Sequence, residues 1–183
     1  RTMRQAWQLW EGKIHPMICE KLMQECKEEL TLRDGTVFSD DDYKPNSEIR
    51  KTKLGFTGNS EIKKLIEYYG FEANRSTFNF DVDYIPDAQF GEYSKGSFYN
   101  WHHDVNWQGK SMYDRKLSVV IQLSDPTTYE GGNFEFQDVE TPVNFRTQGS
   151  ILVFPSYLPH RVTEITDGVR YSLVDWLEGP RWR

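Results

Sequence analysis

The feature that most restricts the fold is a series of short segments after Thr77 in which apolar residues occupy every second position. The repeated apolar positions are Phe78, Phe80 and Val82; Leu117, Val119, Ile121 and Leu123; Phe134 and Phe136; Val143 and Phe145; and Ile151 and Val153. A period of two buries one face of a β-strand. Glycine, proline and aspartate separate the segments, and no helical pattern lies between them, which argues against a parallel α/β sheet. About eight short strands of this kind predict a double-stranded β-helix, or jelly-roll, over residues 77–183.

Two helices are expected before the strands. Pro16 suits the first position of a helix, and Asn59 or Ser60 can cap a second helix that Gly70 would end. The apolar stripe of the first helix comprises Ile18, Cys19, Leu22, Met23, Cys26 and Leu30, and that of the second comprises Ile62, Leu65, Ile66 and Tyr69. Both stripes have the spacing of a helix with one buried face. These helices would support the sheets, so the expected class is α+β, mainly β.

Residues 34–59 are polar, charged and almost free of periodic apolar positions, so we expect a long loop there. Loops of that length often act as lids over active sites. A chain of 183 residues is long enough for one domain with a sizeable core. The expected organisation is therefore a single domain over residues 1–183, with helical support and a lid loop in 1–76 and the β-core in 77–183.

A group of potential metal ligands begins at His102. Residues two apart in a strand point to the same face, so His102 and Asp104 can converge on one metal ion while His103 points away. His160 is the natural third ligand. Two imidazoles and a carboxylate on one side of an octahedron leave positions open for co-substrate and oxygen, as in non-haem Fe(II) oxygenases. The competing interpretation of the tripeptide alone is a surface histidine beside an unrelated acid.

A second group of functional residues lies on the expected strand from Val169 to Trp176. Alternation places Arg170, Ser172, Val174 and Trp176 on one face. A guanidinium group binds a carboxylate through two parallel hydrogen bonds, and a neighbouring hydroxyl can donate to the same carboxylate. This combination suits a dicarboxylate ligand. The alternative is an Arg–Asp salt bridge on an edge strand.

These motifs occur together with several others between Phe78 and Pro180. They are Tyr99-x-x-His102-x-Asp104; Arg115-Lys116-Leu117-Ser118 leading into Ile121-Gln122-Leu123-Ser124; Gly131-Gly132-Asn133-Phe134; Gly149-Ser150-Ile151-Leu152-Val153-Phe154-Pro155; His160-Arg161-Val162; and Gly168-Val169-Arg170-Tyr171-Ser172-Leu173. In this order they resemble the motifs of Fe(II)/2-oxoglutarate-dependent dioxygenases. The similarity is to the prolyl 4-hydroxylase-like group, which includes small bacterial and bacteriophage proteins.

The resemblance implies a cofactor and a co-substrate. His102, Asp104 and His160 would bind Fe(II), and Arg170 would bind the distal carboxylate of 2-oxoglutarate. Further residues would line the co-substrate pocket: Gln122, Ser172, Tyr93, Tyr99 and Trp176. The implied reaction converts 2-oxoglutarate and O2 to succinate and CO2 while a substrate is hydroxylated, with ascorbate as a candidate reductant.

The resemblance also makes a proline-containing peptide or protein the first choice of substrate. Four aromatic residues flank the metal motif and could form an aromatic wall, although some of them could instead belong to the core: Tyr99, Trp101, Trp107 and Tyr113. Asn106 and Arg115 are candidate polar contacts at the mouth of the site, and Arg115 could equally anchor the start of a strand. Hydroxylation of a free amino acid or another small metabolite stays open. The competing class is a non-catalytic jelly-roll binding module or a cupin-type metal-dependent isomerase, neither of which needs Arg170, Ser172 and Gln122 to converge on a dicarboxylate.

Charge and cysteine content restrict the partners and the compartment. The net charge is −6, and the only concentrated positive charge lies at Arg50-Lys51-Thr52-Lys53, so we expect no nucleic-acid partner. We see no signal peptide or membrane span. Cys19 and Cys26 would lie about 10 Å apart along a helix, beyond disulfide reach, which suits a reducing cytoplasm. We therefore expect a cytoplasmic protein, in the host cytoplasm if it is phage-encoded; the oligomeric state is not predicted.

Overall fold

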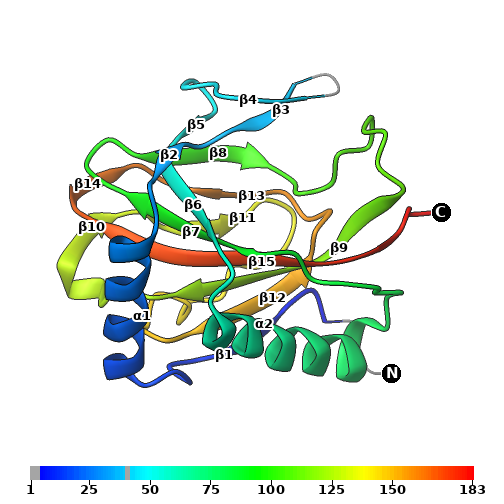
Figure 1. Cartoon of the computed structure of the whole chain (residues 1–183), viewed down its shortest axis with the longest axis horizontal. Coiled ribbons are helices and arrows are strands. Elements are labelled where there is room, and N and C mark those ends of the chain that lie inside the picture. The colour runs from blue at the N-terminus through cyan, green and yellow to red at the C-terminus, as the bar shows by residue number, and fades with distance from the viewer. Residues whose placement is uncertain (1–4, 40–41) are drawn as a thin grey trace.

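Two antiparallel β-sheets face each other in the computed structural model, which describes residues 5–39 and 42–183 (Figure 1). In order across the larger sheet, the strands are β1 (Gln8–Trp10), β12 (Ile151–Pro155), β9 (Tyr113–Gln122), β15 (Arg170–Pro180), β7 (Ala88–Tyr93), β6 (Lys53–Thr57) and β2 (Arg33–Asp34). The smaller sheet consists of β11 (Phe134–Phe136), β13 (His160–Val162), β8 (Phe98–His102) and β5 (Arg50–Lys51). Two further pairs are β3 (Val37–Ser39) with β4 (Asp42–Lys44), and β10 (Tyr129–Gly131) with β14 (Ile165–Gly168). The expected mainly β class and jelly-roll architecture are confirmed.

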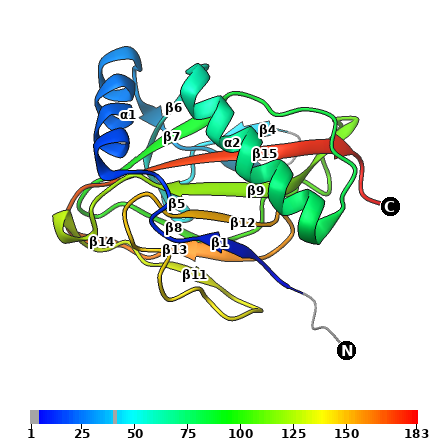
Figure 2. The same ribbon diagram turned by 90° about the horizontal axis from the view of Figure 1, so that it is seen from below.

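The alternation along β9 explains why helices cover one face of the larger sheet and the smaller sheet covers the other. Leu117, Val119 and Ile121 belong to the apolar core beneath the helices. Val120, between them, packs in a separate core with Phe136 of the smaller sheet. Because successive side chains leave a strand on opposite faces, one sequence supplies both cores. Figure 2 shows the resulting layers, with α1 and α2 on one side of the larger sheet and β8, β13 and β11 on the other.

The two helices begin where the sequence predicts. The helix α1 (Pro16–Glu29) has Pro16 at its first position. In α2 (Ser60–Ala73), the side chain of Asn59 accepts hydrogen bonds from two backbone N–H groups of the first turn. In the expected stripe of α1, Cys19, Leu22, Met23 and Cys26 are buried, Leu30 is half-buried, and Ile18 is 38% exposed. Cys19 and Cys26 are buried free thiols, as expected. No helix in the described part of the chain is both long and apolar enough to span a membrane.

The prediction of a long loop over residues 34–59 is wrong. Most of this segment forms the short strands β2 to β6, and β6 and β5 add to the edges of the two sheets through β7 and β8. Strands of two to five residues are too short to show a clear period, and their partners lie far along the chain. The segment is therefore a wall built onto both sheets rather than a structureless lid.

Three other expectations are corrected. Gly70 does not end α2, because the helix continues to Ala73 and then into a π-helical turn, Asn74–Phe78. No strand follows at Phe78, Phe80 and Val82, since the left-handed conformation of Asn79 interrupts an extended chain. The residues 143–146 form a turn rather than a strand, with Val143 87% exposed and Phe145 buried. In the second and third cases, apolar side chains on irregular backbone imitated the pattern of a strand.

Candidate active site

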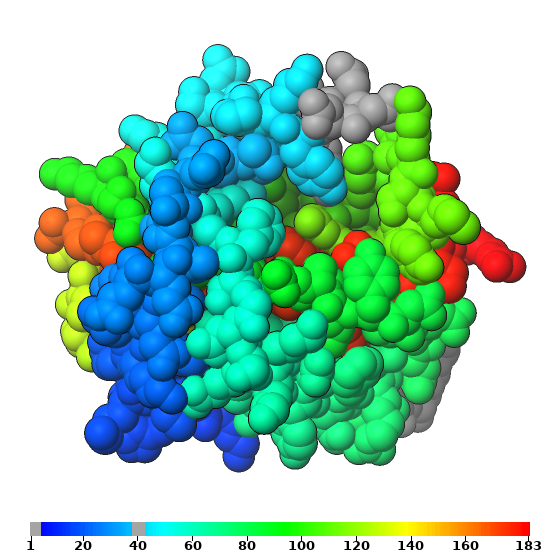
Figure 3. Space-filling view, in the orientation of Figure 1, coloured from blue at the N-terminus to red at the C-terminus, as the bar shows by residue number. Residues whose placement is uncertain are grey.

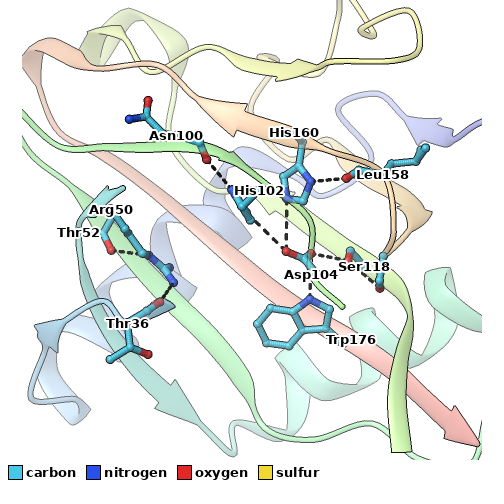
Figure 4. Close-up of polar contacts among 11 residues, drawn as sticks. Thr36, Arg50, Thr52, Asn100, His102, Asp104, Ser118, Leu158, His160 and Trp176 are labelled. Atoms are coloured by element: carbon cyan, nitrogen blue, oxygen red, sulfur yellow. Dashed lines mark hydrogen bonds and ion pairs between the residues drawn. The ribbon is translucent and has the colours of Figure 1, made fainter. Parts of the chain in front are cut away.

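Two histidines and an aspartate meet where β8 and β13 lie side by side. β8 ends at His102, β13 begins at His160, and these two residues are paired across the ladder. The Nε2 atoms of both rings lie 3.5 Å from Oδ1 of Asp104 (Figure 4). One ligand atom from each of the three residues lies within 4.8 Å of the others. The structure thus brings together the three residues that the sequence singled out.

Strand alternation does not orient Asp104, contrary to the sequence argument, because β8 has already ended at His102. Instead, the backbone N–H of Asp104 donates to the carbonyl of Ser156 at 2.8 Å. Its Oδ2 accepts from Ser118 Oγ at 2.6 Å and from Trp176 Nε1 at 3.1 Å. These bonds come from β9 and β15, and they leave Oδ1 facing the two histidines (Figure 4).

The histidine rings are held in the tautomer that a metal needs. Nδ1 of His102 lies 2.7 Å from the carbonyl oxygen of Asn100, and Nδ1 of His160 lies 2.8 Å from that of Leu158. A carbonyl only accepts, so each Nδ1 carries the proton and each Nε2 presents a lone pair. Burial, followed by the proximity of His160, holds the pKa of His102 well below its ordinary value.

This donor set fits a divalent metal ion. Two imidazole lone pairs and a carboxylate oxygen converge without a proton between them, which is unfavourable unless a cation lies at the point of convergence. Two nitrogens and one oxygen are the donors that suit Fe(II) in sites with open positions. His102, Asp104 and His160 are therefore the residues able to hold it.

A buried arginine lies in the same cavity. The expected alternation along β15 holds, since the four residues on its inward face all line the cavity: Arg170, Ser172, Val174 and Trp176. Arg170 is only 2% exposed, and its Nε donates to Oε1 of Gln122 at 3.1 Å. Among residues 5–39 and 42–183, no carboxylate forms an ion pair with it. A buried guanidinium without a counter-ion is costly, so an anionic ligand is the natural partner for its remaining N–H groups.

The cavity has a volume of about 470 Å³ and lies between the two sheets and a wall formed by residues 33–37 and 43–56. Figure 3 shows this face of the molecule hollowed below the blue and cyan segment, with red atoms of the C-terminal strand visible inside. The wall contributes Val37, Leu54 and Phe56 to the lining. The metal ligands and Arg170 therefore share the cavity with a wall that carries both apolar residues and the polar residues Arg33, Asp34 and Thr36.

Several other residues singled out in the sequence line this cavity. They are Tyr93, Tyr99, Ser172, Trp176 and Arg115. The guanidinium of Arg115 lies 3.5 Å from the centroid of the Trp176 ring. His103, which was set aside as a ligand, also borders the cavity but is not part of the convergent group.

Three expected residues are placed elsewhere. Gln122 is not part of the cavity lining and lies behind Arg170, so it contacts the arginine rather than the cavity. Asn106 and Trp107 do not line the cavity, and Trp107 is 51% exposed. The chain leaves β8 after His102 and forms a turn at Trp107 and Gln108.

Sequence reasoning missed residues that support the site from behind. Ser118 holds Asp104, and Tyr129 accepts a hydrogen bond from Gln122 Nε2 at 2.9 Å. Arg50 was noted only as part of a basic cluster, although it is buried beside Tyr99. The inward positions of β9 carried a usable signal for Ser118, because it alternates with the apolar residues that face the helices. No local pattern marked Tyr129 or Arg50.

Comparisons with known proteins agree with this geometry. A family model described as the 2OG-Fe(II) oxygenase superfamily matches residues 88–178, which contain the three convergent ligands and Arg170. A PKHD-type hydroxylase of Prochlorococcus marinus is 34% identical over 95 residues, 51% of this chain and 42% of that protein. A PKHD-type hydroxylase of Synechococcus sp. is 27% identical over 170 residues, 87% of this chain and 72% of that protein. The match thus spans less than half the length of the Prochlorococcus protein.

Solved structures share the fold. A prolyl-4-hydroxylase of Pseudomonas putida superposes with a TM-score of 0.72 at 19% identity and covers 96% of this chain and 94% of its own. A prolyl hydroxylase of Trichoplax adhaerens, in complex with a hypoxia inducible factor peptide fragment, has a TM-score of 0.72 at 15% identity and covers 94% of this chain and 83% of its own. With the metal-ligand set, the buried arginine and the family match in agreement, this chain belongs to the 2OG-Fe(II) oxygenase superfamily.

Proposed function

We propose that this chain is an Fe(II)- and 2-oxoglutarate-dependent hydroxylase that acts on a proline-containing peptide or protein. The observation that carries the proposal is Arg170, a buried guanidinium that forms no ion pair with a carboxylate of the described residues and lines the same cavity as His102, Asp104 and His160. A metal-binding jelly-roll of cupin type has no need of such a residue. A dicarboxylate that reaches from the metal to Arg170 accounts for both features.

Different residues of this chain would hold the iron and the 2-oxoglutarate. When bound, Fe(II) supplies the oxidising chemistry that converts 2-oxoglutarate and O2 to succinate and CO2 and delivers a hydroxyl group to the substrate. His102, Asp104 and His160 would hold the iron, and Arg170 with Ser172 would hold the distal carboxylate. Enclosure between the sheets limits the access of water to the reacting groups.

The residues at the mouth of the cavity support the proposal of a peptide substrate. Phe56 and Tyr43 border it and have exposed rings, while Tyr99 and Trp176 supply apolar surface further in. An apolar proline ring suits this lining, and the Trichoplax prolyl hydroxylase was solved with a peptide. A free amino acid is the second candidate, because the cavity is also large enough for one. The two buried thiols support a reducing compartment, the cytoplasm, as the place of action.

The test is turnover followed by mass spectrometry. The protein is incubated with Fe(II), 2-oxoglutarate, ascorbate and air, together with a panel of proline-containing peptides and free amino acids. We expect succinate and a product heavier by one oxygen atom with at least one peptide, and neither product with His160→Ala. Oxygen incorporation only into a free amino acid would move the assignment to the second candidate. Succinate no higher than that of the His160→Ala control, with every substrate tested, would overturn the proposal.

A further inference from the structure

Arg50 is a buried cation that lies outside the group of metal ligands. It is 7% exposed, and its Nε donates to Oγ1 of Thr52 at 2.9 Å. One Nη donates to the backbone carbonyl of Thr36 at 3.1 Å (Figure 4). The guanidinium carbon lies 4.2 Å from the centroid of the Tyr99 ring. Arg50 is therefore held in one orientation over the face of an aromatic ring, where a cation–π attraction operates.

The ring of Tyr99 in turn lies flat against a metal ligand. Its centroid is 3.5 Å from that of His102, with an angle of 7° between the two planes. The pairing of β5 with β8 creates this arrangement, since Arg50 is directly opposite Tyr99 in the ladder. Arg50, Tyr99 and His102 form one stacked column.

The column restricts a motion of His102 that its hydrogen bond leaves free. The bond from Nδ1 to the carbonyl of Asn100 fixes one point of the ring, but the ring can still tilt about that point. A flat contact with Tyr99 opposes the tilt, and Arg50 holds Tyr99 from its other face. The direction of the Nε2 lone pair toward the metal position then depends on all three residues.

The same arginine reaches the wall of the cavity. Thr36, whose carbonyl accepts from Arg50, lines the cavity. The approach is close at Gly35, where an added Cβ would lie 2.3 Å from Thr52 Oγ1 and 2.6 Å from Arg50 Nε. A side chain at this position would force Thr52 or Arg50 to shift. One buried side chain thus joins the wall, the edge strand β5 and the strand that carries His102.

We propose that Arg50 is a positioning residue for the metal site, which orients His102 through Tyr99 and fastens the cavity wall to the same column. The inference rests on the proposed function, since it concerns the metal ligand of that site. A purely structural arginine would contribute to the stability of the fold and leave the metal site unchanged. The two roles predict different effects on metal binding.

The experiment measures Co(II) binding by titration and the visible spectrum of the Co(II)-loaded protein. Arg50→Met removes the cation and its hydrogen bonds and keeps the apolar length of the side chain. We expect its Co(II) affinity to fall about tenfold or more, the range seen when the partners of metal ligands are changed, and its ligand-field bands to shift. Lys51→Met, on the same strand but exposed, is the matched control and should bind as the natural protein does.

Tyr99→Leu removes the aromatic ring that lies between Arg50 and His102. With this second variant, the test does not depend on the folding of Arg50→Met alone. If the column acts as a unit, Tyr99→Leu weakens Co(II) binding too, and the double variant loses less than the sum of the two single effects. Folded variants with unchanged Co(II) affinity and spectrum, even with a lower melting temperature, would overturn the role of Arg50 alone. A natural protein that binds no Co(II) would overturn the proposed metal site, and this inference with it.

Discussion

At the scale of single residues, the side-chain amide of Gln122 holds the guanidinium of Arg170 in place. Nε2 of Gln122 donates to the carbonyl of Ser124 at 3.1 Å and to the hydroxyl of Tyr129 at 2.9 Å. Both amide hydrogens are thereby used, and Oε1 is turned toward Nε of Arg170. The carbonyl of Ser124, which can only accept, fixes which end of the amide faces the arginine, and the hydroxyl of Tyr129 accepts the second amide hydrogen.

Removal of this hydroxyl tests the network. Tyr129→Phe leaves one amide hydrogen of Gln122 without its acceptor, so Arg170 is held less firmly. We expect the Kd for 2-oxoglutarate to rise about five- to tenfold, the equivalent of one hydrogen bond. Binding of 2-oxobutyrate, which lacks the distal carboxylate, should not change. Calorimetric titration of the metal-loaded protein measures both, with Tyr157→Phe at an exposed site as the control. Equal losses for the two oxo acids would mean that Tyr129 acts on the metal end of the pocket instead.

Asp175 gives stability a pH dependence. It lies on the face of β15 toward the helices, between Leu173 and Leu177, and its Oδ2 is buried without a hydrogen-bond partner in the described part of the chain. Burial raises its pKa from an ordinary 3.8 to about 7. Between these two values the folded chain binds the proton more tightly than the unfolded chain. The free energy of unfolding therefore falls as the pH rises from about 4 to 7.

Asp175→Asn resembles the protonated carboxyl at every pH and removes this effect. We expect little change in the free energy of unfolding near pH 4 and a gain on the order of 2 to 4 kcal/mol at pH 8, since each pKa unit corresponds to about 1.4 kcal/mol. Urea denaturation at several pH values measures the difference, with the exposed Asp167→Asn as the control. A gain that does not vary with pH would contradict the assignment.

Local backbone geometry was enough to predict one face of a functional strand. The inward face of β15 follows from a period of two, and it correctly grouped Arg170, Ser172, Val174 and Trp176. The resemblance implies that Gln122 lines the co-substrate pocket, but Gln122 lies behind Arg170, and which side chain stands in front of another depends on packing across strands. Arg50, paired with Tyr99 in a strand of two residues, carried no periodic signal.

At the scale of elements, α2 packs closely against β15 at a position where the helix carries a glycine. Gly70 is buried, and a Cβ at this position would lie 2.6 Å from Cδ1 of Leu177. Helix-propensity rules assigned this glycine to the end of a helix. In the structure it instead allows the helix to continue close to the sheet, which no local pattern reveals.

Gly70→Val tests this packing. The added side chain gains a few tenths of a kcal/mol in helix propensity, but overpacking against Leu177 costs about 1 to 3 kcal/mol. We expect a lower free energy of unfolding, measured by denaturant titration. Lys64→Val, at an exposed position of the same helix, separates the packing effect from the propensity of valine. A Gly70→Val protein as stable as the Lys64→Val protein would show that the helix is free to move away from the sheet.

At the scale of the whole molecule, the site exists because two sheets face each other. His102 and His160 belong to the smaller sheet and Arg170 to the larger one. A ligand that contacts the metal and Arg170 together bridges the two sheets. Because side chains alternate along β9 and β15, these strands place polar residues toward the space between the sheets. Their apolar residues face the other way and pack against the helices. The layer order was predictable from that alternation, whereas the edge strands that close the cavity were not.

The most direct test of this account is an anaerobic titration of the Fe(II)-loaded protein with 2-oxoglutarate, monitored by visible absorption. We expect the weak charge-transfer band of a metal-chelated 2-oxo acid to appear, and in Arg170→Met to require roughly a hundredfold more 2-oxoglutarate, since a charged hydrogen-bonded partner is lost. Iron that binds without any such band, or a band that forms equally well in Arg170→Met, would contradict the central claim that the metal ligands and Arg170 hold one dicarboxylate between them.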